Sequence, residues 1–139
     1  MSRRASFQEG DLLPTVKRLV DQTRIELYAE ASGDFNPIHV DREYAAGTRF
    51  GSTIAHGMMV AATVSETMAL AFDRRWADGG RLKLRFKAPV YPGDTVTAFG
   101  QVKRVTGVDG VCEVVCSVGV RRQTGELAIV GEATVRLAQ

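Results

Sequence analysis

The sequence predicts an α+β fold in which an antiparallel β-sheet packs against one long, apolar helix. In the C-terminal half, apolar and polar residues alternate over several stretches that are separated by turn residues, which is the pattern of half-buried strands. Residues 58–72 are apolar at almost every position, as is typical of a helix buried on most sides. The chain has 139 residues, the size of one domain, and we expect a single domain over residues 1–139.

Four strands are expected in the C-terminal half. The first is the clearest, because Leu82, Leu84 and Phe86 alternate with basic residues and would form its buried face. Turn residues such as Pro92-Gly93-Asp94 separate it from the strands that follow. The four strands are expected over residues 81–87, 95–105, 111–122 and 127–137. The short turns between them favour an antiparallel meander, and its apolar face has to be covered.

The helix over residues 58–72 is the expected cover. At 1.5 Å per residue it would span roughly 22 Å, about the width of a sheet of four or five strands. Upstream, Thr23-Arg24-Ile25-Glu26 has the form of a capping box and predicts a helix over residues 24–31. Asp41 is expected to cap a shorter helix, and residues 13–20 are expected to form an edge strand.

The composition argues against several classes of protein. Hydrophobic residues make up 45% and charged residues 24%, which is ordinary for a globular domain. A formal net charge of +2 gives no reason to expect a nucleic-acid partner. There is no apolar run of about 18 residues, so no membrane span is expected. The basic start of the chain is not followed by an apolar stretch, so we expect no secretory signal and a cytoplasmic location.

Cys112 and Cys116 are not expected to form a disulfide. They lie four residues apart on one predicted strand, where their Cα atoms would be separated by roughly 13 Å, too far for an S–S bond. We interpret them as buried thiols in a reducing compartment. A zinc site is not expected either, because the C-terminal half contains no histidine and no further cysteine.

The chain has 2 histidines, and both lie between Tyr28 and Met59. Asp34 and His39 stand on either side of an Asn36-Pro37 turn, a spacing that can aim a carboxylate and an imidazole at one small volume. Such a pair suits general acid and base catalysis. The alternative interpretation is an ordinary Asx-type turn that carries a surface histidine.

His56 and Gly57 precede the apolar helix. The backbone N–H of Gly57, at the positive end of this helix, could stabilise negative charge on a ligand oxygen, and glycine lets a ligand approach the backbone closely. His56 is interpreted first as a helix cap or a hydrogen-bonded core residue. Further along the helix, the Ser65 hydroxyl either bonds the carbonyl four residues back or orients the Asp34 carboxylate.

A basic stripe on the first predicted strand has two interpretations. It could meet phosphate groups of a ligand, or it could be the solvent-facing side of a strand whose other face is apolar. We favour the second, because charged residues opposite an apolar face are what any solvated strand presents. The stripe consists of Arg81, Lys83, Arg85 and Lys87.

Two stretches of the sequence resemble a known family. The run Tyr28-Ala29-Glu30-Ala31-Ser32-Gly33-Asp34-Phe35-Asn36-Pro37-Ile38-His39, followed by Ile54-Ala55-His56-Gly57-Met58-Met59, closely resembles the hydratase motif of the MaoC-like (R)-specific enoyl-CoA hydratases. The resemblance implies a hotdog fold, in which an antiparallel sheet wraps around a long central helix. It also implies hydration of trans-2-enoyl-CoA to (R)-3-hydroxyacyl-CoA, a reaction that needs no metal or organic cofactor.

The same resemblance assigns roles to residues. Asp34 and His39 are then the catalytic dyad, and the Gly57 N–H is the oxyanion donor. Ser65 lies where the family has a serine that supports the aspartate, and Asn36 matches an asparagine that shapes the loop. Further candidates for substrate contact are His56, Met58 and Arg85.

The expected substrate is an acyl-CoA or acyl-carrier-protein thioester. The main alternative activity is an (R)-3-hydroxyacyl dehydratase that acts on acyl carrier protein, possible also as the catalytic subunit of a heterodimer. A thioesterase on the same fold ranks lower, because the motif is the hydratase pattern. A non-catalytic module that binds acyl thioesters is also considered, although such a module has no need of a paired acid and base.

A homodimer or higher oligomer is expected, since such a sheet leaves an edge strand to pair. No nucleic-acid or membrane partner is expected, and the motif leaves the acyl chain open.

Overall fold

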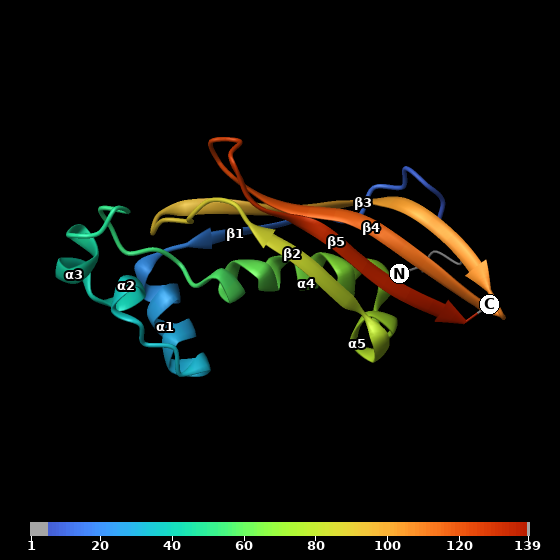
Figure 1. The fold of residues 1–139 in the computed structure, drawn as a ribbon, viewed down its shortest axis with the longest axis horizontal. Helices are drawn as coiled ribbons and strands as arrows, with labels where there is room; N and C mark the ends of the chain where they lie inside the picture. Colours follow the sequence, from blue (N-terminus) through green and yellow to red (C-terminus); the bar gives the residue numbers. More distant parts are fainter. Residues whose placement is uncertain (1–5, 139) are drawn as a thin grey trace.

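The structure, a computed structural model, describes residues 6–138. Five antiparallel strands form one sheet in the order β1-β3-β4-β5-β2, and α4 lies along one of its faces (Figure 1). The strands are β1 (Val16–Val20), β2 (Arg81–Phe86), β3 (Asp94–Val108), β4 (Val111–Arg122) and β5 (Leu127–Ala138). The helices are α1 (Gln22–Ser32), α2 (Pro37–Val40), α3 (Arg42–Ala46), α4 (Gly57–Phe72) and α5 (Arg74–Gly79). The predicted α+β class is confirmed.

The helix α4 supplies the middle of the hydrophobic core. Its residues Val64, Met68 and Phe72 are each 0% exposed, and they belong to one core cluster with sheet residues such as Val96 and Val114. The helix predicted as the cover of the sheet is therefore confirmed, one residue longer at its start. In Figure 1, α1, α2 and α3 gather at the end of the sheet where α4 begins. The main catalytic candidates from the sequence, Asp34, His39 and Gly57, lie at that end of the sheet.

The predicted meander is correct for only three of its four strands. β3, β4 and β5 are neighbours in order, but β2 pairs with β5 at the far edge of the sheet rather than with β3. Residues 87–93, which join β2 to β3, therefore cross the sheet instead of turning back on it. The turn residues in this segment were visible in the sequence, whereas the choice of partner strand depends on the whole sheet.

The start of α1 also differs from the prediction. The helix begins at Gln22, and the carboxylate of Asp21 accepts the N–H of Arg24 at 2.8 Å. The cap is thus Asp21, and the capping box predicted at Thr23 is wrong, because the carboxylate two residues earlier starts the helix and satisfies the N–H of Arg24. At the other end, Gly33 has a φ of 79°, in the left-handed region that favours glycine.

Other local differences are small. The strand predicted over residues 13–20 is shorter, since β1 begins at Val16, and Pro14 has no N–H to give to the ladder. Asp41 caps α3 as predicted, accepting the N–H of Tyr44 at 3.0 Å. The short helices α2 and α5 were not predicted.

The strand β2 is not the half-buried strand that its alternation predicted. It is an edge strand, and two residues of its apolar face, Leu82 and Phe86, are 40% and 56% exposed. Only Leu84 packs partly against the core. Within one chain, the apolar face of this strand therefore extends beyond what the rest of the fold covers.

A buried ion pair fixes the turn that precedes β3. The carboxylate of Asp94 accepts hydrogen bonds from the Arg122 guanidinium at 2.7 Å and from the N–H of Tyr91 at 2.8 Å. Burial acts to raise the pKa of Asp94, but the hydrogen bonds from Arg122 and Gln123 outweigh it and hold the pKa below its usual value. This turn follows directly on Val90, which lines a cavity at the candidate site.

Both cysteines are free thiols, as predicted, but only Cys116 is buried; Cys112 is partly exposed, and its predicted burial is wrong. Cys116 is fully buried, and burial raises the pKa of its thiol to about 12, so it stays protonated and unreactive at neutral pH. None of the helices that the structure describes is long and apolar enough to cross a membrane.

Candidate active site

Asp34 stands in the short loop between α1 and α2. Gly33 turns the chain out of α1, and the N–H of Asp34 donates to the Ser32 hydroxyl at 3.2 Å. Asn36 then caps α2, because its side-chain oxygen accepts the N–H of Ile38 at 3.1 Å. The N–H of Asn36 also donates to the Asp34 carboxylate at 3.2 Å. This asparagine therefore shapes the loop, which leaves Asp34 exposed.

His39 lies on α2 with a defined ring orientation. Its Nδ1 is 2.8 Å from the carbonyl oxygen of Ile54. A carbonyl can only accept, so Nδ1 carries the proton and donates, which leaves a lone pair on Nε2 in the neutral ring. The backbone around it is also held: the N–H of Ile54 donates to the Ile38 carbonyl at 3.1 Å, and the Gln22 amide donates to the His39 carbonyl at 2.9 Å.

His56 connects the two members of the predicted dyad. It is 2% exposed, and its Nε2 donates to the backbone carbonyl of Asp34 at 2.9 Å. Its ring stacks on that of His39, with centroids 3.9 Å apart and an interplanar angle of 24°, and its centroid lies 4.7 Å from that of Tyr28. The Nδ1 of His56 is buried and has no hydrogen-bond partner in the part of the chain that the structure describes.

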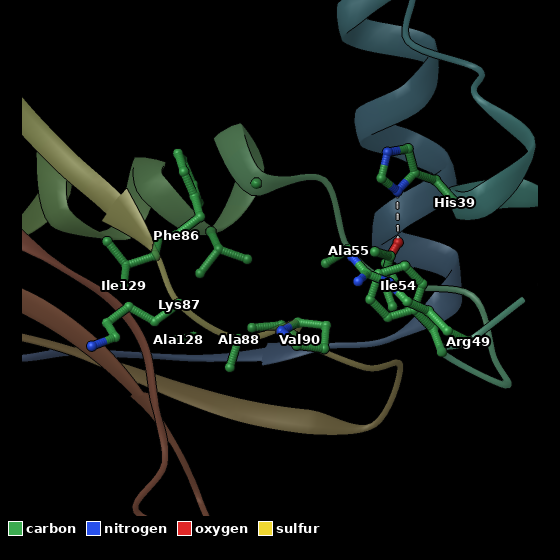
Figure 2. Close-up of a pocket in the computed structure, with 14 residues that line it drawn as sticks. His39, Arg49, Ile54, Ala55, Phe86, Lys87, Ala88, Val90, Ala128 and Ile129 are labelled. Carbon is green, nitrogen blue, oxygen red and sulfur yellow. Dashed lines mark hydrogen bonds between the residues drawn. The ribbon is translucent and has the colours of Figure 1, made fainter.

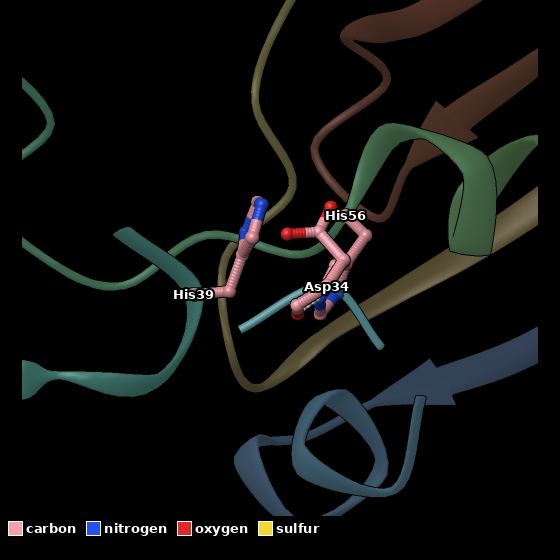
Figure 3. A group of neighbouring side chains, drawn as sticks. All are labelled: Asp34, His39 and His56. Atoms are coloured by element: carbon pink, nitrogen blue, oxygen red, sulfur yellow. Dashed lines mark hydrogen bonds between the residues drawn. The ribbon is translucent and has the colours of Figure 1, made fainter. Parts of the chain in front are cut away.

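Asp34, His39 and His56 meet at one point, where one polar atom of each lies within 4.8 Å of the others (Figure 3). Two histidines and a carboxylate are also a common set of metal ligands, so the geometry has to be tested. A metal binds an imidazole nitrogen in the plane of the ring, at about 2 Å. Because the two rings are stacked and nearly parallel, no position at that distance lies in both planes. The cluster is better suited to moving a proton than to holding an ion.

Two cavities open beside this cluster. One, of about 330 Å³, has His39 and Gly57 in its lining (Figure 2), and the other, of about 390 Å³, has Asp34 and Gly57. Gly57 and Phe86 line both cavities. Gly57 is exposed and is the first residue of α4, so its N–H has no acceptor within the helix. A ligand oxygen at this N–H would lie where the cavity that contains Asp34 and the cavity that contains His39 share a lining residue.

Comparison with known proteins identifies the family. The model of the MaoC like domain matches residues 6–124. The chain belongs to the MaoC-like domain family. An (R)-specific enoyl-CoA hydratase of Rhodospirillum rubrum is 36% identical over 121 residues, which cover 87% of this chain and 82% of the relative. A mitochondrial 3-hydroxyacyl-[acyl-carrier-protein] dehydratase of Arabidopsis thaliana is 31% identical over 129 residues, 92% of this chain and 76% of the relative.

A solved structure supports the same assignment. The (R)-hydratase of Aeromonas caviae involved in PHA biosynthesis superposes with a TM-score of 0.81 at 30% identity, covering 96% of this chain and 99% of that one. The predicted hotdog fold is therefore confirmed for this MaoC-like chain.

The other predicted residues lie in different places in the MaoC-like domain. Met58 is 66% exposed and lines the same cavity as Asp34. Arg85 lies on β2 opposite Val130 and lines neither of the two cavities.

Ser65 has a different partner from either of those considered in the sequence. Its hydroxyl accepts the indole N–H of Trp76 at 2.8 Å, which ties α4 to α5. Among the described residues, the structure records no hydrogen bond from Ser65 to Asp34 or to the carbonyl four residues back.

Three residues at the site were missed or undervalued. Phe86 was assigned to a covered face of the sheet, although it lines both cavities. Arg49 was not considered, because it belongs to no motif. His56 was expected to be a cap or a hydrogen-bonded core residue, and the second interpretation is correct, since its side chain makes no cap bond. Its place inside the second motif segment, directly before Gly57, was the one signal that could have linked it to the dyad.

Proposed function

We propose that this protein hydrates trans-2-enoyl-CoA to (R)-3-hydroxyacyl-CoA, with Asp34 and His39 as the catalytic dyad. The observation that carries the proposal is the meeting of these two side chains within 4.8 Å, beside cavities that both reach Gly57 at the start of α4. The similarity to an (R)-specific enoyl-CoA hydratase over most of both chains supports the same reaction.

The dyad would work on one water molecule. The double bond of an enoyl thioester is electrophilic at C3, and attack by water there forms a C–O bond while negative charge moves to the thioester oxygen. The dyad takes a proton from the attacking water, for which Nε2 of His39 and the Asp34 carboxylate both offer lone pairs. The dyad then returns a proton to C2 from the same side. One water is consumed, and both side chains end the cycle unchanged.

The N–H of Gly57 would hold the thioester oxygen during this step. It stands at the N-terminus of a 16-residue helix, where unpaired N–H groups and the helix dipole favour negative charge. His56 is assigned a positioning role rather than substrate contact, because its buried ring bonds the Asp34 backbone and stacks on His39.

A second copy of the chain would cover the exposed apolar surface beside the site. The edge strand β2 leaves one side of its backbone unpaired, and Leu82, Phe86 and Met58 are exposed nearby on β2 and α4. We expect a homodimer in which the two β2 edges face each other. Light scattering coupled to size exclusion would test this, and a fully active monomer would contradict it.

The second candidate function is the reverse reaction on a carrier protein. It is favoured by the similarity to a 3-hydroxyacyl-[acyl-carrier-protein] dehydratase, which is 31% identical to this chain. The same three groups would serve, because hydration and dehydration share one transition state. A non-catalytic thioester-binding module has no use for the fixed tautomer and free Nε2 of His39.

The test is a panel of trans-2-enoyl thioesters of increasing acyl length, on CoA and on acyl carrier protein. Loss of the enoyl-thioester absorbance reports hydration, and chiral analysis of the product reports the (R) configuration. Activity that requires the carrier protein would favour the second candidate. Binding of the thioesters without any loss of absorbance at any length would overturn both enzymatic functions in favour of the binding module.

A further inference from the structure

The cavity that has His39 and Gly57 in its lining is also lined by positively charged side chains. Arg49 and Lys87 belong to its lining, and no Asp or Glu does (Figure 2). Both cations are exposed, so they lie where the cavity meets solvent. In Figure 2 they stand on different sides of the cavity. An anionic ligand entering this cavity would therefore meet a positive potential without an opposing carboxylate.

Arg49 is held in place without an acidic partner. Its guanidinium carbon lies 4.7 Å from the centroid of the Phe50 ring, within the range of a cation–π contact. The turn that carries it is also fixed, because the Thr48 hydroxyl donates to the Ala45 carbonyl at 2.7 Å and accepts the N–H of Phe50 at 3.3 Å. Among the described residues, no carboxylate forms an ion pair with Arg49 or Lys87. Within residues 6–138, the guanidinium of Arg49 therefore contacts the Phe50 ring and has no carboxylate partner.

The proposed substrate has charge in only one part. The enoyl group, the thioester and the pantetheine arm are uncharged, whereas the phosphate ester at the end of that arm is anionic in both CoA and acyl carrier protein. The arm separates this phosphate from the reacting thioester, and the lining of this cavity likewise contains two exposed cations and the half-buried His39. A guanidinium presents paired donors that suit phosphate oxygens, and an ammonium adds a second charge.

We propose that Arg49, assisted by Lys87, binds the phosphate of the pantetheine carrier and so anchors the thioester with its reactive end at His39 and Gly57. This inference rests on the proposed function. It assigns the phosphate contact to Arg49, which no motif indicated, and to one member of the basic stripe, Lys87. Arg85 lines neither cavity and has no part in the contact.

The test compares three substrates that differ only in the carrier: crotonyl-CoA, crotonyl-4′-phosphopantetheine and crotonyl-pantetheine, the last without phosphate. Arg49→Gln and Lys87→Gln should each raise KM for crotonyl-CoA about fivefold, the effect of one exposed ion pair, with kcat unchanged. KM for crotonyl-pantetheine should stay the same. Arg104→Gln, which removes an exposed cation from β3, is the matched control and should change neither value.

The three substrates also separate the sources of the phosphate. An effect with crotonyl-4′-phosphopantetheine assigns the contact to the phosphate that CoA and carrier protein share. An effect with crotonyl-CoA alone would assign the contact to the phosphates at the adenosine end and would overturn the proposed contact with the phosphate of the arm. Equal losses with crotonyl-pantetheine would overturn it, because Arg49 would then bind the uncharged arm or act on the fold. No loss with any substrate would overturn it as well.

Binding measurements keep this proposal separate from the proposed reaction. Titration calorimetry with free CoA and with pantetheine requires no turnover, so it can be read even if none of the thioesters is hydrated. Wild-type protein should bind CoA more tightly than pantetheine, and this preference should fall with added salt. The double variant Arg49→Gln/Lys87→Gln should lose the preference. Equal binding of CoA and pantetheine by the wild-type protein would refute the phosphate contact whatever the enzyme's activity.

Discussion

The rings of His39 and His56 stack at a centroid distance of 3.9 Å, and they differ in their surroundings, because Nδ1 of His56 is buried whereas His39 lines the cavity that also reaches Gly57. His56 is the buried member and donates from Nε2 to the Asp34 carbonyl. In the proposed mechanism Nε2 of His39 is therefore available to exchange a proton, while His56 contacts both His39 and the Asp34 loop.

Variants of His56 should separate its two contacts. His56→Phe keeps a ring under His39 but removes the donor to the backbone carbonyl of Asp34, so the Asp34 loop loses the hydrogen bond that joins it to His56. We expect kcat to fall about tenfold or more, with a smaller change in KM. His56→Gln, which can place an N–H near the position of Nε2, should recover part of kcat although it lacks the ring.

The measurement is steady-state kinetics with circular dichroism as a check on folding. Nitrogen NMR of the imidazoles gives a second readout, because the hydrogen bonds assign the proton to Nε2 in His56 and to Nδ1 in His39. The opposite tautomers would contradict the positioning role. So would a His56→Phe variant with the kcat of the wild type.

Removal of the dyad should abolish activity without loss of the fold. Asp34→Asn and His39→Ala each remove one proton-transferring group, and such groups contribute about 10² to 10⁴ in rate. Asp34 is exposed, so its replacement by an isosteric amide should leave the melting temperature nearly unchanged. The measurement is the loss of enoyl-thioester absorbance together with thermal unfolding. Wild-type activity in either folded variant would show that the mechanism is wrong, even if the reaction is right.

The activity should depend on the lack of a side chain at Gly57 as well as on its N–H. A Cβ added at this position would lie 3.0 Å from Cε1 and 3.2 Å from Cδ1 of Phe86. Since Phe86 is exposed, its ring can move, so Gly57→Ala should cost little stability but narrow the place where both cavities meet. We expect kcat/KM for crotonyl-CoA to fall about tenfold, roughly the effect of a disturbed oxyanion donor.

A double variant provides the control for this prediction. Gly57→Ala/Phe86→Leu removes the ring that the new methyl group would meet, and it should regain part of the lost kcat/KM. If Phe86→Leu adds its own loss to that of Gly57→Ala without any recovery, the two residues do not share the site in the way that the contact implies.

Local patterns in the sequence were sufficient for most elements of the fold. The apolar run that became α4 and the alternation in β4 depend on neighbouring residues, and both were predicted nearly to the residue. The partner of β2 was not, because β5 lies more than forty residues away in the chain and the choice depends on how residues 87–93 cross the sheet. The exposure of Phe86 has the same origin, since alternation reports which residues share a face and not whether anything covers it.

The residues of the candidate site likewise fall into two groups: those that a local pattern was enough to predict, and those whose role depends on tertiary contacts. Asp34, Asn36 and His39 belong to one turn whose geometry follows from Asn and Pro chemistry, so a single segment was enough to nominate them. The link through His56 requires that residues 54–56 lie alongside α2, which is a tertiary contact. Ser65 illustrates the reverse case, because its hydroxyl bonds Trp76 on a helix that was not predicted.

The buried pair of Asp94 and Arg122 should make stability depend on pH at the acid end. Asp94 has a pKa below its usual value of 3.8 because the hydrogen bonds it accepts outweigh the effect of burial. A group whose pKa is lowered by folding stabilises the native state above its unfolded pKa, and the contribution is lost as pH falls through the folded value. Asp94→Asn should therefore lower the free energy of unfolding by about 2 kcal/mol at pH 7, within the range for breaking a buried pair and its hydrogen bonds. The difference from wild type should shrink below pH 3.8.

Glu126→Gln is the matched control, since Glu126 binds the same guanidinium at 2.7 Å but is exposed, and it should cost less than about 1 kcal/mol. Urea unfolding at several pH values measures both variants. Two results would contradict the view that the charged form of Asp94 provides this stability. One is an equal loss of unfolding free energy in the two variants at pH 7. The other is a loss for Asp94→Asn that is as large at pH 3 as at pH 7.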